Sequence, residues 1–79
     1  MGIVIYTKPG CPLCDEAAQL LHQYRARYGF TLETQDVDAS AVLAAEHGNW
    51  VPVVTINGRL RFRGRVSAVL LQRILDVGM

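Results

Sequence analysis

The spacing of the apolar residues changes abruptly at residues 9–12, and this change limits what the chain can fold into. Before it, Ile3-Val4-Ile5-Tyr6 is a β-branched and aromatic run that ends at Pro9-Gly10, which is typical of a short buried strand. After it, apolar residues recur at helical spacing, at Leu13, Ala17, Leu20, Leu21, Tyr24 and Tyr28. The pattern predicts a buried strand that leads directly into a long amphipathic helix, with Pro12 at its start and Gly29 as its C-terminal cap.

The middle of the chain predicts a second strand and a second, shorter helix. Residues 30–37 alternate between apolar and polar positions, as a half-buried strand does. Either Asp38 or Ser40 can then cap a short helix that runs through Ala45 and stops at Gly48.

The clearest local signal is Asn57-Gly58, because this dipeptide favours the two-residue type I′ turn of a β-hairpin. Residues 51–56 and 59–63 flank the turn and are expected to form its antiparallel strands. Ser67 can cap a last helix. We expect its core-facing residues to be Leu70, Leu71, Ile74 and Leu75. The element order is therefore β-α-β-α-β-β-α, in a single domain covering residues 1–79.

Composition excludes several classes of function. The net charge of +1 does not suit a general nucleic-acid binder, which needs many Lys and Arg residues to neutralise phosphates. No run of eighteen apolar residues could span a bilayer. We therefore expect a cytoplasmic monomer that contacts neither nucleic acid nor a membrane.

Cys11 and Cys14 are the only cysteines, and they lie where the first strand gives way to the first helix. A disulfide between them would close too short a loop to stabilise a domain, so we expect a chemical role. The positive end of a helix stabilises a thiolate at Cys11, which makes Cys11 the nucleophile. Cys14, one turn further into the helix, is placed to resolve a mixed disulfide. Lys8 adds positive charge near Cys11.

The segment Tyr6-Thr-Lys-Pro-Gly-Cys-Pro-Leu-Cys-Asp-Glu-Ala resembles the active-site segment of bacterial glutaredoxin-like proteins, in the thioredoxin superfamily. Trp50-Val51-Pro52 strengthens the resemblance, because the family carries a cis-proline at this place. The resemblance implies an α/β minimal thioredoxin fold, with a four-stranded mixed sheet and helices on both faces. It also implies that Pro52 is cis, that the Val51 backbone hydrogen-bonds an extended substrate, and that Lys8 helps to bind glutathione.

Further substrate contacts are expected around this motif. Pro12 and Leu13 lie between the cysteines, and Trp50 is either an aromatic wall beside them or a packing residue at the start of a strand. Arg65 is nearest the expected ligand groove and can meet an anion such as a glutathione carboxylate. Glutathione-binding relatives carry Gly-Gly and an acidic pair where this chain has residues 64–68, so we expect glutathione to bind weakly.

The end of the chain is basic. The charges sum to −3 through Gly58 and to +4 after it. Strand alternation predicts that Arg59, Arg61 and Arg63 share one face, with Leu60 and Phe62 on the other. Such a face is typical of an edge strand protected from pairing with other chains.

The sequence predicts a thiol–disulfide oxidoreductase that reduces protein or glutathione mixed disulfides, holds no bound cofactor or metal, and draws electrons from glutathione or a thioredoxin reductase-type donor. An iron–sulfur or zinc carrier ligated through Cys11 is one alternative. A closed zinc site would need His22 and His47 as further ligands. A redox-inert binding module with a thioredoxin fold is the other alternative.

Overall fold

The first strand leads into the first helix as the apolar spacing predicts. The computed structural model describes residues 1–78, in which β1 (Gly2–Thr7) is followed by α1 (Pro12–Tyr28). Pro12 occupies the first turn of α1, where a missing N–H costs nothing. Gly29 ends the helix with a φ of 73°, and its N–H donates to the Arg25 carbonyl at 2.8 Å.

The next elements are β2 (Thr31–Asp36), a single 3₁₀ turn (Val37–Ala39) and α2 (Ala41–His47). Of the two expected capping residues, Ser40 caps α2, and its hydroxyl oxygen accepts the Leu43 N–H at 3.4 Å. The helix runs two residues beyond the expected end, because Gly48 also keeps a helical conformation.

The hairpin consists of β3 (Val53–Ile56) and β4 (Arg59–Arg63), and α3 (Ala68–Val77) follows. Both turn residues have positive φ, 52° at Asn57 and 80° at Gly58, as a type I′ turn requires. Asn57 also anchors the start of β1, since its N–H donates to the Gly2 carbonyl at 2.8 Å and its side chain accepts the Gly2 N–H at 3.0 Å.

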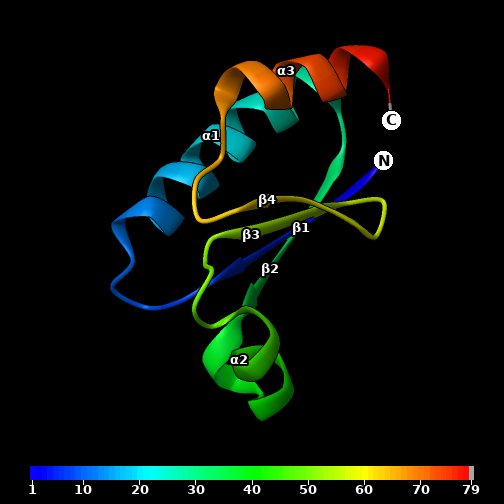
Figure 1. Ribbon diagram of the computed structural model, residues 1–79. Helices are drawn as coiled ribbons and strands as arrows, with labels where there is room; N and C mark the ends of the chain where they lie inside the picture. Colours follow the sequence, from blue (N-terminus) through cyan, green and yellow to red (C-terminus); the bar gives the residue numbers. More distant parts are fainter. Residues whose placement is uncertain (79) are drawn as a thin grey trace.

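The four strands form one mixed sheet in the order β2-β1-β3-β4, with β1 and β2 parallel and the other pairs antiparallel. Helices α1 and α3 cover one face, and α2 lies on the other side at one end of the sheet (Figure 1). The ring of His47 in α2 contacts the ring of Tyr6 in β1, with centroids 4.5 Å apart. The expected minimal thioredoxin fold with helices on both faces is confirmed.

The hydrophobic core lies between the sheet and the helix pair α1 and α3. Alternate residues of the strands meet the inner stripes of these helices, which accounts for the burial of Ile3, Ile5, Ala17, Leu21, Phe30, Val54, Ile56, Phe62, Leu71 and Leu75. Burying a large apolar side chain contributes roughly 1.5–3 kcal/mol, so this layer carries most of the stability of so short a chain.

Leu70 departs from the expected core of α3, because it is half exposed, while Leu71 and Leu75 are buried and Ile74 packs at the core boundary. The helix therefore buries a narrower stripe than its apolar content suggested. No helix within residues 1–78 has the length and apolar character needed to cross a membrane.

A β-bulge in the last strand overturns the expected division of its side chains. Val54 pairs with Phe62 and Thr55 pairs with Leu60, so Arg61 is an extra residue in β4. Leu60 and Phe62 consequently face opposite sides of the sheet, with Phe62 7% exposed in the core and Leu60 52% exposed. The same shift means that Arg59 and Arg63 do not share a face.

Candidate functional site

Three chain segments meet at one end of the sheet. Tyr6 of β1 pairs with Val53 of β3, and Val53 pairs with Arg63 of β4. Three segments therefore adjoin neighbouring positions of the sheet. One leaves β1 and carries the cysteines, one leads into β3, and one leaves β4. Figure 1 shows these segments together at the left-hand end of the sheet, next to the start of α1.

Cys11 is the N-cap of α1. Its backbone is extended, with φ −103° and ψ 104°, and its Sγ accepts the N–H of Cys14 at 3.2 Å. The sulfur thus occupies the place of the usual Ser or Asp capping oxygen, where unpaired N–H groups and the helix dipole favour an anion. Cys11 is half-buried, and its thiol is free in this structure.

Cys14 lies one turn further into α1 and is 2% exposed. Burial, reinforced by a hydrogen bond with Cys11, raises the pKa of the Cys14 thiol to about 11, although a hydrogen bond with the Lys8 backbone acts in the opposite direction. Cys14 is therefore a protonated, shielded thiol behind a more accessible one.

A pocket of about 290 Å³ opens beside Cys14, and its charged lining residues are Lys8, Asp15 and Asp36. Asp36 reaches this place because β1 and β2 are parallel and Thr7 pairs with Asp36. The pocket carries two carboxylates and one ammonium group. We call it the acidic pocket.

The segment before β3 contains a cis peptide bond between Val51 and Pro52, as the resemblance implied. The N–H of Gly64 donates to the carbonyls of Trp50 at 2.8 Å and of Pro52 at 2.9 Å. These two bonds hold the Trp50–Pro52 segment against the segment that leaves β4. Pro52 is buried, and Val51 is half-buried.

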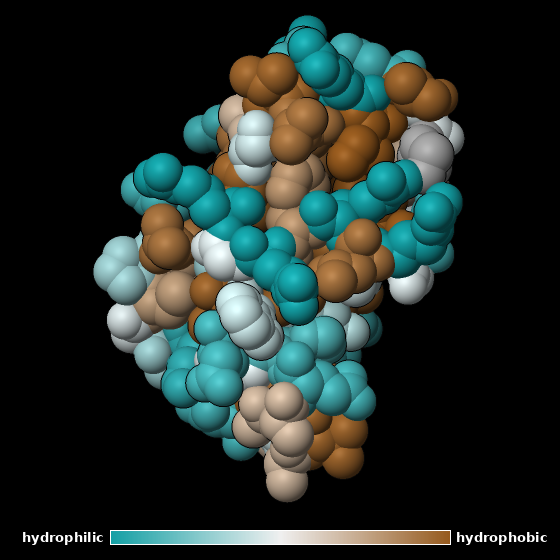
Figure 2. Space-filling view, in the orientation of Figure 1, coloured by the Kyte–Doolittle hydropathy of each residue, from teal (hydrophilic) through white to brown (hydrophobic). Residues whose placement is uncertain are grey.

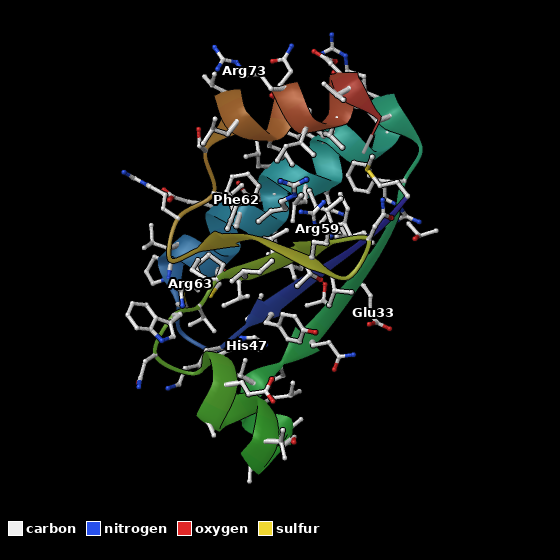
Figure 3. The ribbon with its side chains drawn as sticks, turned by 45° about the vertical axis from the view of Figure 1, so that its right-hand side comes forward. Glu33, His47, Arg59, Phe62, Arg63 and Arg73 are labelled. Atoms are coloured by element: carbon white, nitrogen blue, oxygen red, sulfur yellow. The ribbon has the colours of Figure 1, made fainter. Side chains whose placement is uncertain are left out.

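Trp50 is not a core residue, because it is 52% exposed. The guanidinium carbon of Arg63 lies 5.0 Å from the centre of the Trp50 ring, within the range of a cation–π contact. Figure 3 labels Arg63 at this end of the sheet, on the side of His47. Trp50 was interpreted either as an aromatic wall beside the cysteines or as a packing residue, and its exposure favours the first interpretation.

A second, smaller pocket of about 170 Å³ lies on another side of α1, where Leu13, Glu16 and Leu20 meet Arg65 and Val66. We call it the Arg65 pocket. Leu13 and Pro12 are exposed at the start of α1. The structure thus places Arg65 beside Leu13, one of the two residues between the cysteines.

The expected site residues do not form one cavity. Lys8 lines the acidic pocket with Cys14, whereas Leu13 and Arg65 line the Arg65 pocket. The two pockets use different positions of α1, Asp15 and Ala18 for the first and Glu16 and Leu20 for the second, so they lie on different sides of the helix.

Neither histidine joins the cysteines. His22 is exposed on α1. The ring of His47 contacts that of Tyr6 at a tilt of 36°, and its Nε2 lies 3.7 Å from the Glu46 carboxylate. Tyr6, at the end of the predicted buried strand, is half-buried. Within residues 1–78, no three His, Cys, Asp or Glu side chains cluster closely enough to hold a metal ion.

Sequence reasoning missed Arg63 and Asp36 as members of this end of the molecule, and it placed Gly64 here only through the resemblance to glutathione-binding relatives. A signal for Arg63 and Gly64 existed in the chain itself, because counting back from the Asn57-Gly58 turn places residues 63 and 64 opposite residues 51–53. Asp36 follows only from the parallel pairing of β2 with β1, which the sequence did not specify.

Known proteins resemble this chain over most of its length. It is 30% identical over 70 residues to a "Probable Thioredoxin" of Methanothermobacter thermautotrophicus, covering 85% of this chain and 82% of that protein. It is 36% identical over 62 residues to the "Uncharacterized protein Rv0508" of Mycobacterium tuberculosis, covering 72% of this chain. That alignment spans 64% of the mycobacterial protein.

Solved structures share the fold. The X-ray structure of the protein XcR50 from X. campestris superposes with a TM-score of 0.78 at 29% identity, covering 98% of this chain and 99% of that one. Residues 2–76 match the family described as Glutaredoxin-like domain (DUF836). The strand-to-helix dithiol, the cis-proline segment and these matches together show that the chain belongs to this glutaredoxin-like family of the thioredoxin superfamily.

Proposed function

We propose that this protein is a thiol–disulfide oxidoreductase in which Cys11 attacks the substrate disulfide and Cys14 resolves the intermediate. The observation that carries the proposal is the pairing of the half-buried Cys11, whose sulfur caps the N-terminus of α1, with the buried Cys14 thiol one turn behind it. The glutaredoxin-like family and the probable thioredoxin among its relatives support thiol redox chemistry.

The reaction proceeds in two exchanges. The Cys11 thiolate forms a bond to one substrate sulfur, the substrate S–S bond breaks, and the released thiolate takes a proton from water. Cys14 then loses its proton and attacks Cys11, which releases the second substrate sulfur as a thiol. The substrate gains two electrons, and the protein is left with a Cys11–Cys14 disulfide.

The surroundings of Cys11 suggest how a substrate is held. The Val51 backbone lies between the two carbonyls that accept from Gly64, and we place the extended substrate chain along it. Exposed Pro12 and Leu13 contact the substrate beside the reacting sulfur, and Trp50 provides an aromatic surface. Arg65 attracts anionic groups from one side, while Lys8 lies among the carboxylates of the acidic pocket on the other side.

The roles of the cysteines can be tested by trapping. Cys14→Ser keeps the first attack and loses the second, so it should accumulate a mixed disulfide with a peptide disulfide, detected by mass spectrometry. Cys11→Ser should accumulate none. Equal trapping by both variants, or trapping by Cys11→Ser alone, would contradict the assignment.

The electron donor can be identified separately. The oxidised protein is offered to glutathione with glutathione reductase, and in parallel to a thioredoxin reductase with NADPH. The system that reduces it at a useful rate is the donor. Iron content and visible absorbance of the protein purified without oxygen distinguish this function from an iron–sulfur carrier that uses Cys11.

A further inference from the structure

We infer that the preferred substrates are protein disulfides with acidic residues beside the reacting cysteine. This inference rests on the proposed function and names its substrate class. Its basis is a pair of exposed arginines, Arg63 and Arg65, on the β4 side of the cysteine site. We call this pair the arginine rim.

The position of the arginine rim follows from backbone contacts. Arg63 pairs with Val53, directly after the cis-proline segment, and Gly64 bonds the carbonyls on either side of Val51. Arg65 then lines a pocket with Leu13, which lies between the two cysteines. Two guanidinium groups therefore flank the segment along which we place the substrate chain.

The charges of the arginine rim are not neutralised by the protein. Within residues 1–78, neither Arg63 nor Arg65 has a carboxylate within ion-pair distance. Glu16 shares the pocket of Arg65 without reaching it. Arg63 instead packs on the exposed ring of Trp50, which holds the guanidinium near the surface and leaves its N–H groups able to bind carboxylates.

The opposite side of the cysteine site has the opposite charge. The acidic pocket carries Asp15 and Asp36 against the single ammonium of Lys8. A substrate with acidic residues would be repelled from this side and attracted to the arginine rim. Figure 2 shows hydrophilic side chains gathered across the middle of the molecule over β4, with hydrophobic ones above them on α3. The charge difference across the site fixes the orientation of a substrate as well as its affinity.

The test uses three disulfide-linked peptides of equal length, with glutamate, glutamine or lysine on both sides of the cysteine. Reduction by the full-length protein is measured as kcat/KM at low salt. We expect the glutamate peptide to be reduced about three- to tenfold faster than the lysine peptide, since each exposed ion pair makes only a modest contribution. The difference should shrink at high salt, because ions screen exposed charges.

Matched variants assign the preference to the arginine rim. Arg63→Gln with Arg65→Gln should remove most of the difference between the glutamate and lysine peptides, and Arg63→Lys with Arg65→Lys should restore it. Arg59→Gln with Arg73→Gln also removes two positive charges, one from the other end of β4 and one from α3, and should leave the ratio unchanged. Figure 3 shows Arg59 and Arg63 well separated along this strand. A ratio of rates is used because a purely structural effect would slow all three peptides together.

The outcomes separate this inference from the proposed function. Reduction of all three peptides at equal rates overturns the substrate preference and leaves the oxidoreductase intact. A preference that survives in Arg63→Gln with Arg65→Gln overturns the arginine rim as its cause. Failure to reduce any peptide when a reductant is supplied contradicts the oxidoreductase itself.

Discussion

At the scale of single residues, the two cysteines lie one helical turn apart, but their environments differ. Cys11 Sγ accepts a backbone N–H at the start of a helix, whereas Cys14 is buried and its pKa is raised to about 11, chiefly by burial. In the reduced protein at pH 7, we expect iodoacetamide to modify Cys11 before Cys14. Peptide mapping after brief exposure measures this order, and faster modification of Cys14 would reverse the assigned roles.

The raised pKa of Cys14 also predicts a pH dependence of stability. The thiol keeps its proton up to about pH 11 in the folded chain, against an ordinary value of 9.0. The unfolded chain therefore loses this proton first as pH rises, and folding loses stability between pH 9 and pH 11. Denaturant unfolding of the reduced protein across this range should show the decline.

Cys14→Ser is the control for this pH dependence. The Tyr28 hydroxyl donates to Asp76, and this bond raises the pKa of Tyr28, so the tyrosine adds a decline of the same sign. Cys14→Ser retains the tyrosine contribution and lacks that of the thiol. An unchanged pH profile in this variant would show that Cys14 does not titrate as stated.

Residue roles could be predicted where chemistry and local position coincide. Cys11 was assigned to the helix cap because the apolar spacing changes at Pro12, and the structure confirms that placement. Exposure was harder to predict. Leu70 and Leu71 have the same side chain, and only the rotation of α3 on the sheet buries Leu71 and exposes Leu70.

At the scale of elements, the hairpin turn is the feature most open to a quantitative test. Gly58 has a φ of 80°, and a Cβ added there would meet no atom within 4 Å. Gly58→Ala therefore costs only backbone strain, which we expect to lower the free energy of unfolding by about 1–2 kcal/mol. Denaturant titration measures the loss.

Gly58→Asn is the matched comparison for the turn, because asparagine tolerates the left-handed region better than alanine. It should destabilise the protein less than Gly58→Ala. Equal losses in both variants would mean that the positive φ is not what the turn requires.

The strands were easier to predict than their register. The Asn57-Gly58 turn located β4 and the end of β3 correctly, since the turn chemistry is local, but β3 begins at Val53 and not at residue 51. The bulge at Arg61 was not predictable from the alternation of side chains. It lets Phe62 reach the core next to Val54, while Leu60 pairs with Thr55 on the other face. Packing across the sheet decides that register, and the alternation of side chains along a strand does not reveal where a bulge will occur.

At the scale of the whole molecule, the sheet determines which distant residues become neighbours. Cys11, Pro52 and Arg65 were expected to share a site, and strand pairing brings their segments to one end of the sheet. The division between Lys8 and Arg65 was not expected, because it depends on how α1 is rotated against β1 and β2. Tertiary packing sets that rotation. The apolar stripe of the helix is wide enough to permit a range of rotations, so the sequence pattern alone does not select one.

The separation of Lys8 from Arg65 affects how well glutathione can bind. Lys8 and Arg65 line separate pockets, so one small peptide is poorly placed to use both. The start of α3 offers no carboxylate for the glutathione ammonium, because Ser67 and Ala68 stand there. The Ser67 hydroxyl oxygen is also already used, since it accepts the Leu70 N–H at 3.3 Å. We expect slow reduction of a glutathione mixed disulfide by the native protein.

Adding the missing carboxylates should correct this weakness. Aspartate caps a helix as well as serine does and suits the positive helix end, so Ser67→Asp with Ala68→Asp should preserve α3. A hydrogen bond between charged groups contributes roughly 1.5–3 kcal/mol, so we expect a rise of about tenfold or more in kcat/KM for a glutathionylated peptide. Ser67→Asn with Ala68→Asn keeps the shape without the charge and should give little gain. The inference fails if the asparagine pair performs as well as the aspartate pair, or if the native protein already matches an authentic glutaredoxin assayed beside it.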